Sequence, residues 1–157
     1  MHSFDKLLEI PDLDPTVRKS FQREQLSELT LPLATSLLEG GFVSVVAAKA
    51  FDAEPWVIAV ISASPMFGNL ASFFWTRLAA GRSKVPMVVT LQMMVLLCVV
   101  AIAVSPRSHA GAMVLLCSVV LARILIAGII TVRSVAWSLN YERALRARAT
   151  GRLQAIT

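Results

Sequence analysis

The sequence predicts an all-α protein, a polytopic membrane bundle of four transmembrane helices. Hydrophobic residues make up 56% of the 157 residues, and the mean hydropathy is +0.68, whereas soluble domains hold about 45–50% apolar residues. The apolar residues form contiguous blocks, and residues 87–104 carry no charged side chain. At about 1.5 Å per residue, such a block crosses a hydrocarbon core about 30 Å thick. Contiguous blocks do not fit the alternating strands of a transmembrane barrel.

Four apolar blocks define the expected helices, with polar or basic segments on either side. The helices are residues 26–50, 55–79, 85–104 and 111–139, between an N-terminal segment, residues 1–25, and a basic loop, residues 140–157. The connections "FDAE", "AGRSK" and "SPRSHA" are short, so consecutive helices should be antiparallel neighbours. The N-terminal segment either carries a short amphipathic helix on the inner membrane face or is a disordered tail.

The distribution of Lys and Arg predicts the orientation of the spans. Basic residues gather before the first span, between the second and third, and after the fourth, while the opposite side holds only Lys49 and Arg107. Both termini are therefore expected on the cytoplasmic side of a bacterial cytoplasmic (inner) membrane. This pattern accounts for the net charge of +5, so the expected partner is the lipid bilayer and no nucleic acid is expected.

Charged residues lie inside the apolar blocks, where each costs roughly 2.5–3.5 kcal/mol at the bilayer centre. Glu39 falls near the middle of the first span and Arg123 near the middle of the fourth. Their similar depth predicts an ion pair, which is either a structural salt bridge or a functional pair lining a cavity. Arg133 lies closer to the cytoplasm, and we expect its long side chain to extend toward the inner interface.

Polar residues follow helical spacing on three of the four spans and predict a shared polar interior. The stripes are Glu28, Thr35 and Glu39 on the first span, Ser62, Pro65, Asn69, Ser72 and Thr76 on the second, and Arg123, Ala127, Ile130, Ser134, Ser138 and Tyr141 on the fourth. The third span holds only Thr90 and Gln92 in its charge-free run and should be peripheral.

Glycines inside the spans predict close helix contacts, because small residues let helices approach each other in lipid. Gly68 and Gly128 lie within the second and fourth spans. Gly40 and Gly41, beside Glu39, mark either such a contact or a bend next to a binding site.

The turn after the second span and the end of the fourth span resemble the major facilitator superfamily of transporters. In "TRLAAGRSKVP", the Leu-Ala and Gly-Arg steps match the family's loop signature, and Ala80 stands where the family has Asp. In "RILIAG", Arg123 matches the family's fourth-helix Arg. The stretch "NYERALRARATGRL" resembles the cytoplasmic turn before the family's fifth helix. Residues in the positions of the gating-loop motif are Arg77, Gly81, Arg82 and Lys84.

The resemblance covers residues 26–157 and implies a twelve-helix fold built from inverted three-helix repeats. This chain would then be an N-terminal fragment, and its partners would be the missing C-terminal helices and a small-molecule substrate. The implied activity is secondary, ion-coupled transport by alternating access. Candidate residues for substrate binding or coupling are Glu39, Arg123, Asn69 and Arg133.

The sequence also allows comparison with two other classes of protein, a standalone membrane protein and an enzyme. The chain could be a standalone four-helix membrane protein that acts as an interaction partner or a small oligomeric exporter. An enzyme is not expected, because His2 and His109 are isolated and no phosphate-binding loop, His-Glu-x-x-His or Cys-x-x-Cys occurs. No metal or other cofactor is expected, and we expect Cys98 and Cys117 to pack as small hydrophobic residues.

Overall fold

The computed structural model describes residues 35–36, 38 and 40–140. Residues Thr35–Ala136 form one compact unit. The described part is all helical, which confirms the predicted fold class at that level. The predictions for residues 1–34 and 141–157, including Glu28 and Tyr141, lie outside the described residues.

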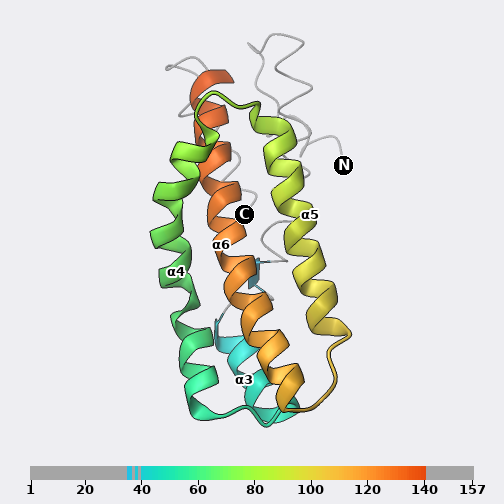
Figure 1. Ribbon diagram of the computed structural model, residues 1–157. Coiled ribbons are helices and arrows are strands. Elements are labelled where there is room, and N and C mark those ends of the chain that lie inside the picture. The colour runs from blue at the N-terminus through green and yellow to red at the C-terminus, as the bar shows by residue number, and fades with distance from the viewer. Residues whose placement is uncertain (1–34, 37, 39, 141–157) are drawn as a thin grey trace, which may run out of the picture. The chain divides into compact units, whose positions relative to one another are not determined.

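Four helices make up the described part, and successive helices run in opposite directions (Figure 1). They are α3 (Gly40–Ala50), α4 (Pro55–Ala79), α5 (Lys84–Ala103) and α6 (His109–Asn140). The bounds of α4 coincide with those expected from the sequence, and those of α5 and α6 differ from the expected ones by one or two residues. Pro55 suits the first turn of α4, where a missing N–H breaks no helical bond.

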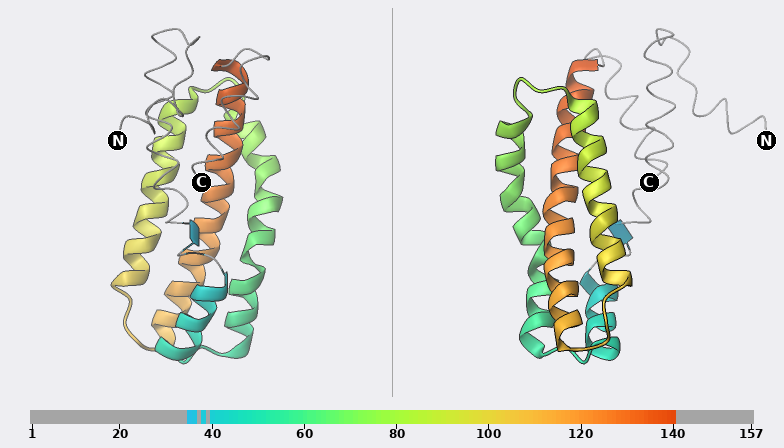
Figure 2. Two further views of the ribbon diagram at one scale, coloured as in Figure 1. Left: turned by 180° about the vertical axis from the view of Figure 1, so that it is seen from behind. Right: turned by 45° about the vertical axis from the view of Figure 1, so that its right-hand side comes forward.

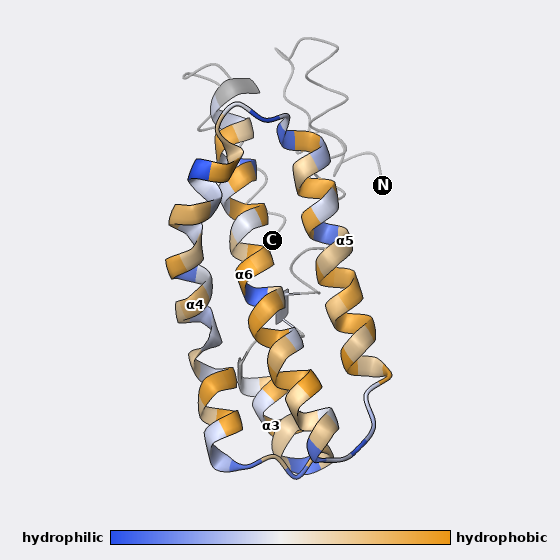
Figure 3. Cartoon of the chain, in the orientation of Figure 1, coloured by the Kyte–Doolittle hydropathy of each residue, from blue (hydrophilic) through white to orange (hydrophobic). Residues whose placement is uncertain are grey.

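Three of the described helices are long and apolar enough to cross a membrane: Pro55–Ala79, Lys84–Ala103 and His109–Ser138. Figure 3 shows that apolar residues dominate these helices, whereas the connections between them are hydrophilic. Helix α3 has 11 residues and spans ~16 Å, about half of a hydrocarbon core.

The first expected helix, residues 26–50, does not run unbroken through the described residues, which corrects that prediction. Leu38 lies in a turn, where its N–H donates to the carbonyl of Thr35 at 3.1 Å, and α3 begins only at Gly40. Two consecutive glycines, Gly40 and Gly41, disfavour continuation of a helix by about 1 kcal/mol each relative to alanine. The interruption frees the Leu38 carbonyl for another partner.

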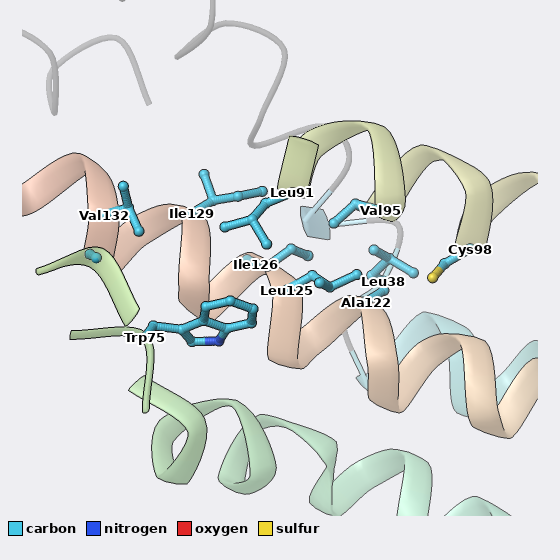
Figure 4. Packing of buried hydrophobic residues seen from close by; sticks show 11 residues of the cluster. Leu38, Trp75, Leu91, Val95, Cys98, Ala122, Leu125, Ile126, Ile129 and Val132 are labelled. Atoms are coloured by element: carbon cyan, nitrogen blue, oxygen red, sulfur yellow. The ribbon is translucent and has the colours of Figure 1, made fainter. Parts of the chain in front are cut away.

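Helix α6 is the central helix of the unit and lies between α4 and α5 (Figures 1 and 2). Half of its membrane-candidate segment is buried, against 22% for α4 and 17% for α5. One buried cluster joins α6 to α4 and α5, and its members include Trp75, Leu91, Val95, Leu125 and Ile129 (Figure 4). A second cluster joins α6 to α3 and α4 and includes Val43, Ala47, Ile61, Leu115 and Val119.

Candidate functional site

Helices α4 and α6 meet closely near their midpoints, which sets the position of Arg123. A Cβ added to Gly68 of α4 would lie 3.1 Å from the carbonyl oxygen of Arg123 and 3.5 Å from the Cβ of Ala127. Only glycine allows the two backbones to approach this closely without displacement of a neighbour. The contact therefore fixes the depth of Arg123 relative to the middle of α4.

The side chain of Arg123 reaches the interruption that precedes α3. Its Nη2 donates a hydrogen bond to the carbonyl oxygen of Leu38, with 2.8 Å between the two atoms. Leu38 is 3% exposed, so this non-helical carbonyl is enclosed by protein, the condition under which such backbone is tolerated at membrane depth. Arg123 thus satisfies a carbonyl that a continuous helix would have satisfied itself.

The positive charge of Arg123 has no carboxylate partner among the described residues. The carboxylates of the described part are those of Asp52 and Glu54, both in the connection between α3 and α4. The Nε atom of Arg123 is buried and makes no hydrogen bond to any described residue. A guanidinium carries five N–H donors and stays protonated, so most of its donor capacity is unused within the described residues.

The other candidate site residues predicted from the sequence are Glu39, Arg133 and Asn69. Glu39, the expected partner of Arg123, lies outside the described residues, and the ion pair stays a prediction. Arg133, which we expected to extend toward the inner interface, is buried at 8% exposure. Asn69 is exposed on α4 and directly follows Gly68, so its backbone lies beside that of Arg123.

The polar stripes of α4 and α6 lie on the same side of the helix pair, the side on which α3 packs. On α4, the Ser62 hydroxyl pairs with the hydroxyl of Ser44 in α3 at 3.2 Å. On α6, Arg123 bonds to Leu38, which precedes α3. Because α3 is short, both stripes continue past its first residue. We call this continuation the polar face, and its residues are Asn69, Ser72, Thr76, Arg123, Ala127, Ile130 and Ser134.

The hydroxyl groups of the polar face bond to carbonyls of their own helices. Ser72 donates to the carbonyl of Asn69, Thr76 to that of Ser72 and Ser134 to that of Thr131, a pattern that satisfies hydroxyls without an outside partner. The side-chain amide of Asn69 makes no hydrogen bond to any described residue. Asn69 and Arg123 are therefore the two groups of the polar face with donors available for a further partner.

Arg77, Gly81 and Lys84, which match positions of the family's loop signature in the sequence, shape the turn between α4 and α5. The Arg77 guanidinium lies 4.8 Å from the centre of the Phe73 ring, a cation–π contact. Gly81 has a φ of +71°, which favours glycine. The Lys84 Nζ donates to the carbonyls of Ala79 and Arg82, each at 2.6 Å, and so places a cation at the C-terminal end of α4.

Sequence reasoning identified the small residues of the α4–α6 contact but missed the aromatic residue that fills it. The Trp75 Nε1 donates to the carbonyl of Ile124 at 2.9 Å, and a Cβ added to Gly128 would lie 2.8 Å from the indole ring. Trp75 lies two turns after Gly68, on the same face of α4. That spacing from an intramembrane glycine is the signal that could have pointed to Trp75.

Comparison of the chain with protein-family models, with curated proteins and with solved structures found no match. Among the described residues, no group of three or more His, Cys, Asp or Glu side chains comes together as a metal site would require. Arg123, Leu38 and the polar face are the features of the described residues that bear on function.

Proposed function

We propose that this chain forms the N-terminal part of a secondary transporter of the major facilitator type. The whole protein would move a small solute across a bacterial cytoplasmic membrane by alternating access, coupled to an ion, with both ends of this chain on the cytoplasmic side. The observation that carries the proposal is the hydrogen bond from Arg123, in the middle of an apolar helix, to the carbonyl of an interrupted helix at Leu38.

Physical chemistry favours a functional role for this arrangement. A charged residue within a membrane helix is costly and is typically retained where it faces a bundle interior or an aqueous cavity. Interrupted helices whose free carbonyls meet polar groups near the membrane midplane are a recurring feature of solute-binding sites in transporters. The polar face extends from this point along α4 and α6 and would line the solute pathway.

Individual residues take distinct roles under this proposal. Arg123 and Asn69 contact the solute. Glu39 follows Leu38 in the sequence and would exchange a proton or ion as Arg123 changes partner. Arg133 would stabilise the interior nearer the cytoplasm, and the turn of Arg77, Gly81, Arg82 and Lys84 would control the relative motion of α4 and α5.

A second candidate is a standalone four-helix protein that self-associates as an interaction partner or oligomeric exporter. The exposed amide of Asn69 near the middle of α4 favours it, because interhelical amide bonds join membrane helices. A stable oligomer of the chain in detergent that Asn69→Ala dissociates would support this candidate.

Transport by the reading frame that contains this chain is the test. The gene is read through and beyond the codon for Thr157, and the product is reconstituted into liposomes with an imposed proton gradient and a panel of labelled solutes. We expect gradient-dependent uptake of at least one solute, loss of uptake in Arg123→Gln, and altered pH dependence in Glu39→Gln.

The matched control is Arg107→Gln, which removes one positive charge from an exposed connection. It should transport like the unmodified protein. Full activity in Arg123→Gln, or a folded protein that moves none of the solutes, would contradict the proposal.

A further inference from the structure

We infer that Arg123 and Asn69 bind the carboxylate group of a small organic monoanion with an apolar body. The inference rests on the proposed transport function and names the class of its substrate. It begins from the position of the two side chains: Gly68 holds the backbone of α4 against that of Arg123, Asn69 follows Gly68, and both side chains belong to the polar face.

The two side chains offer the donors that a carboxylate needs. Arg123 spends one Nη2 bond on the Leu38 carbonyl, and its Nε is buried out of a ligand's reach. The donors left for a ligand are the two hydrogens of Nη1 and the second hydrogen of Nη2. The Asn69 amide adds two N–H groups. A planar carboxylate can accept two parallel bonds from a guanidinium while one of its oxygens accepts from the amide, so the donor set fits this group directly.

The charge of the polar face favours a monoanion. Helices α4, α5 and α6 contain no Asp or Glu, and Arg123 is the charged residue of the polar face. When Glu39 takes up a proton and releases Arg123, as under the proposed function, one ligand carboxylate neutralises the guanidinium. A phosphate dianion would then leave a surplus negative charge at membrane depth, where an unpaired charge is costly.

The surroundings of Arg123 select an apolar body for the ligand. Ala127 and Ile130 follow Arg123 on the same stripe of α6, and Ile130 is 58% exposed. The hydroxyls of Ser72 and Thr76 are turned to their own helices, so they offer little to a polyhydroxylated solute. An aromatic or short aliphatic acid fits this combination of one charged end and an apolar neighbourhood.

Benzoate and benzamide form the matched pair of probes, because they share a ring and differ in charge. Titration calorimetry on the purified full chain in lipid nanodiscs should show saturable binding of benzoate. Benzamide should bind at least about tenfold more weakly, since a hydrogen bond to a charged group contributes about 1.5–3 kcal/mol. Inorganic phosphate should not compete with benzoate.

Variants assign the binding to the two side chains. Arg123→Gln should weaken benzoate binding about tenfold or more, and Asn69→Ala should weaken it about threefold to tenfold. Arg123→Lys keeps the charge but loses the planar fork, so it should bind benzoate with an affinity between those of the unmodified chain and Arg123→Gln. Arg107→Gln, a charge-matched control in an exposed connection, should bind as the unmodified chain does.

Three results would overturn the inference: no saturable benzoate binding by the folded chain, equal binding of benzamide, or unchanged binding in Arg123→Gln. Circular dichroism and size-exclusion chromatography show whether each variant folds. If Arg123→Gln does not fold, benzoate binding by Arg123→Lys and by Asn69→Ala tests the inference instead, and unchanged binding in both would overturn it. Uptake of other solutes without benzoate binding would reject this inference and leave the proposed function standing. Benzoate binding by a protein that transports nothing would support binding of a carboxylate at this site and reject the proposed transport function.

Discussion

The two contacts that α6 makes with its long neighbours differ in kind. Toward α4, the contact depends on shape: a glycine on each helix, an indole against one of them, and a hydrogen bond from Trp75 to the Ile124 carbonyl. Toward α5, the contact is a narrow aliphatic stripe in which Leu91, Val95 and Cys98 are the buried residues of α5. The remaining surface of α5 is mostly apolar and exposed.

The difference implies that the α4–α6 contact tolerates few substitutions, whereas the α5–α6 contact tolerates many. Burial from water does not drive helices together inside lipid, so association depends on packing and hydrogen bonds. The α4–α6 contact supplies both and holds Asn69 and Arg123 at one depth. The buried residues of α5 at the α5–α6 contact are apolar and pack by dispersion, and aliphatic residues of similar volume can replace one another there.

The largest effect is expected from removal of the indole at the α4–α6 contact. Trp75→Ala should lower the free energy of unfolding by about 3–5 kcal/mol, because it leaves a cavity and removes the hydrogen bond from the indole to the Ile124 carbonyl. Trp75→Phe keeps an aromatic ring and loses the hydrogen bond, which contributes about 0.5–1.5 kcal/mol. Unfolding by SDS titration in mixed micelles measures both, and equal losses in the two variants would show that the ring itself contributes little.

A smaller effect is expected from filling the space that Gly128 leaves. The new Cβ in Gly128→Ala would lie 2.8 Å from the Trp75 ring, so the indole must move, at a cost of about 1–3 kcal/mol. Combination with Trp75→Ala should abolish this cost, since the obstructing ring is gone. Additive losses in the double variant, measured in the same titration, would contradict the assigned contact.

The smallest effect is expected on the α5 side. Leu91→Met conserves volume in the aliphatic stripe and should change the free energy of unfolding by less than about 1.5 kcal/mol. Benzoate binding in nanodiscs should be unchanged, because Leu91 lies on the other helix contact. A loss as large as that of Gly128→Ala would remove the distinction between the two contacts.

Much of this architecture could be predicted from the sequence, because length and continuity of apolar blocks determine which segments can cross a membrane. Helix α4 has its expected bounds, and helical spacing alone placed Asn69 and Arg123 on polar stripes. The turn at Leu38 could not be predicted, because Gly40 and Gly41 permit either a close contact or a bend. The choice depends on Arg123, 85 residues away. The hydrogen bond between Trp75 and Ile124 could not be predicted either, because it depends on which faces of α4 and α6 meet.

The polar face of α4 should meet water while the neighbouring face of the same helix meets lipid. Asn69 and Leu70 test it directly, since they are adjacent, exposed and at one depth, and Leu70 is 76% exposed. Asn69→Cys and Leu70→Cys are made in a background in which Ala replaces Cys98 and Cys117. The rate at which a charged, water-soluble maleimide modifies each new thiol is then measured in liposomes. We expect reaction to be about tenfold faster or more at position 69, because thiolate forms in water and not in lipid. Equal rates, or faster reaction at position 70, would contradict it.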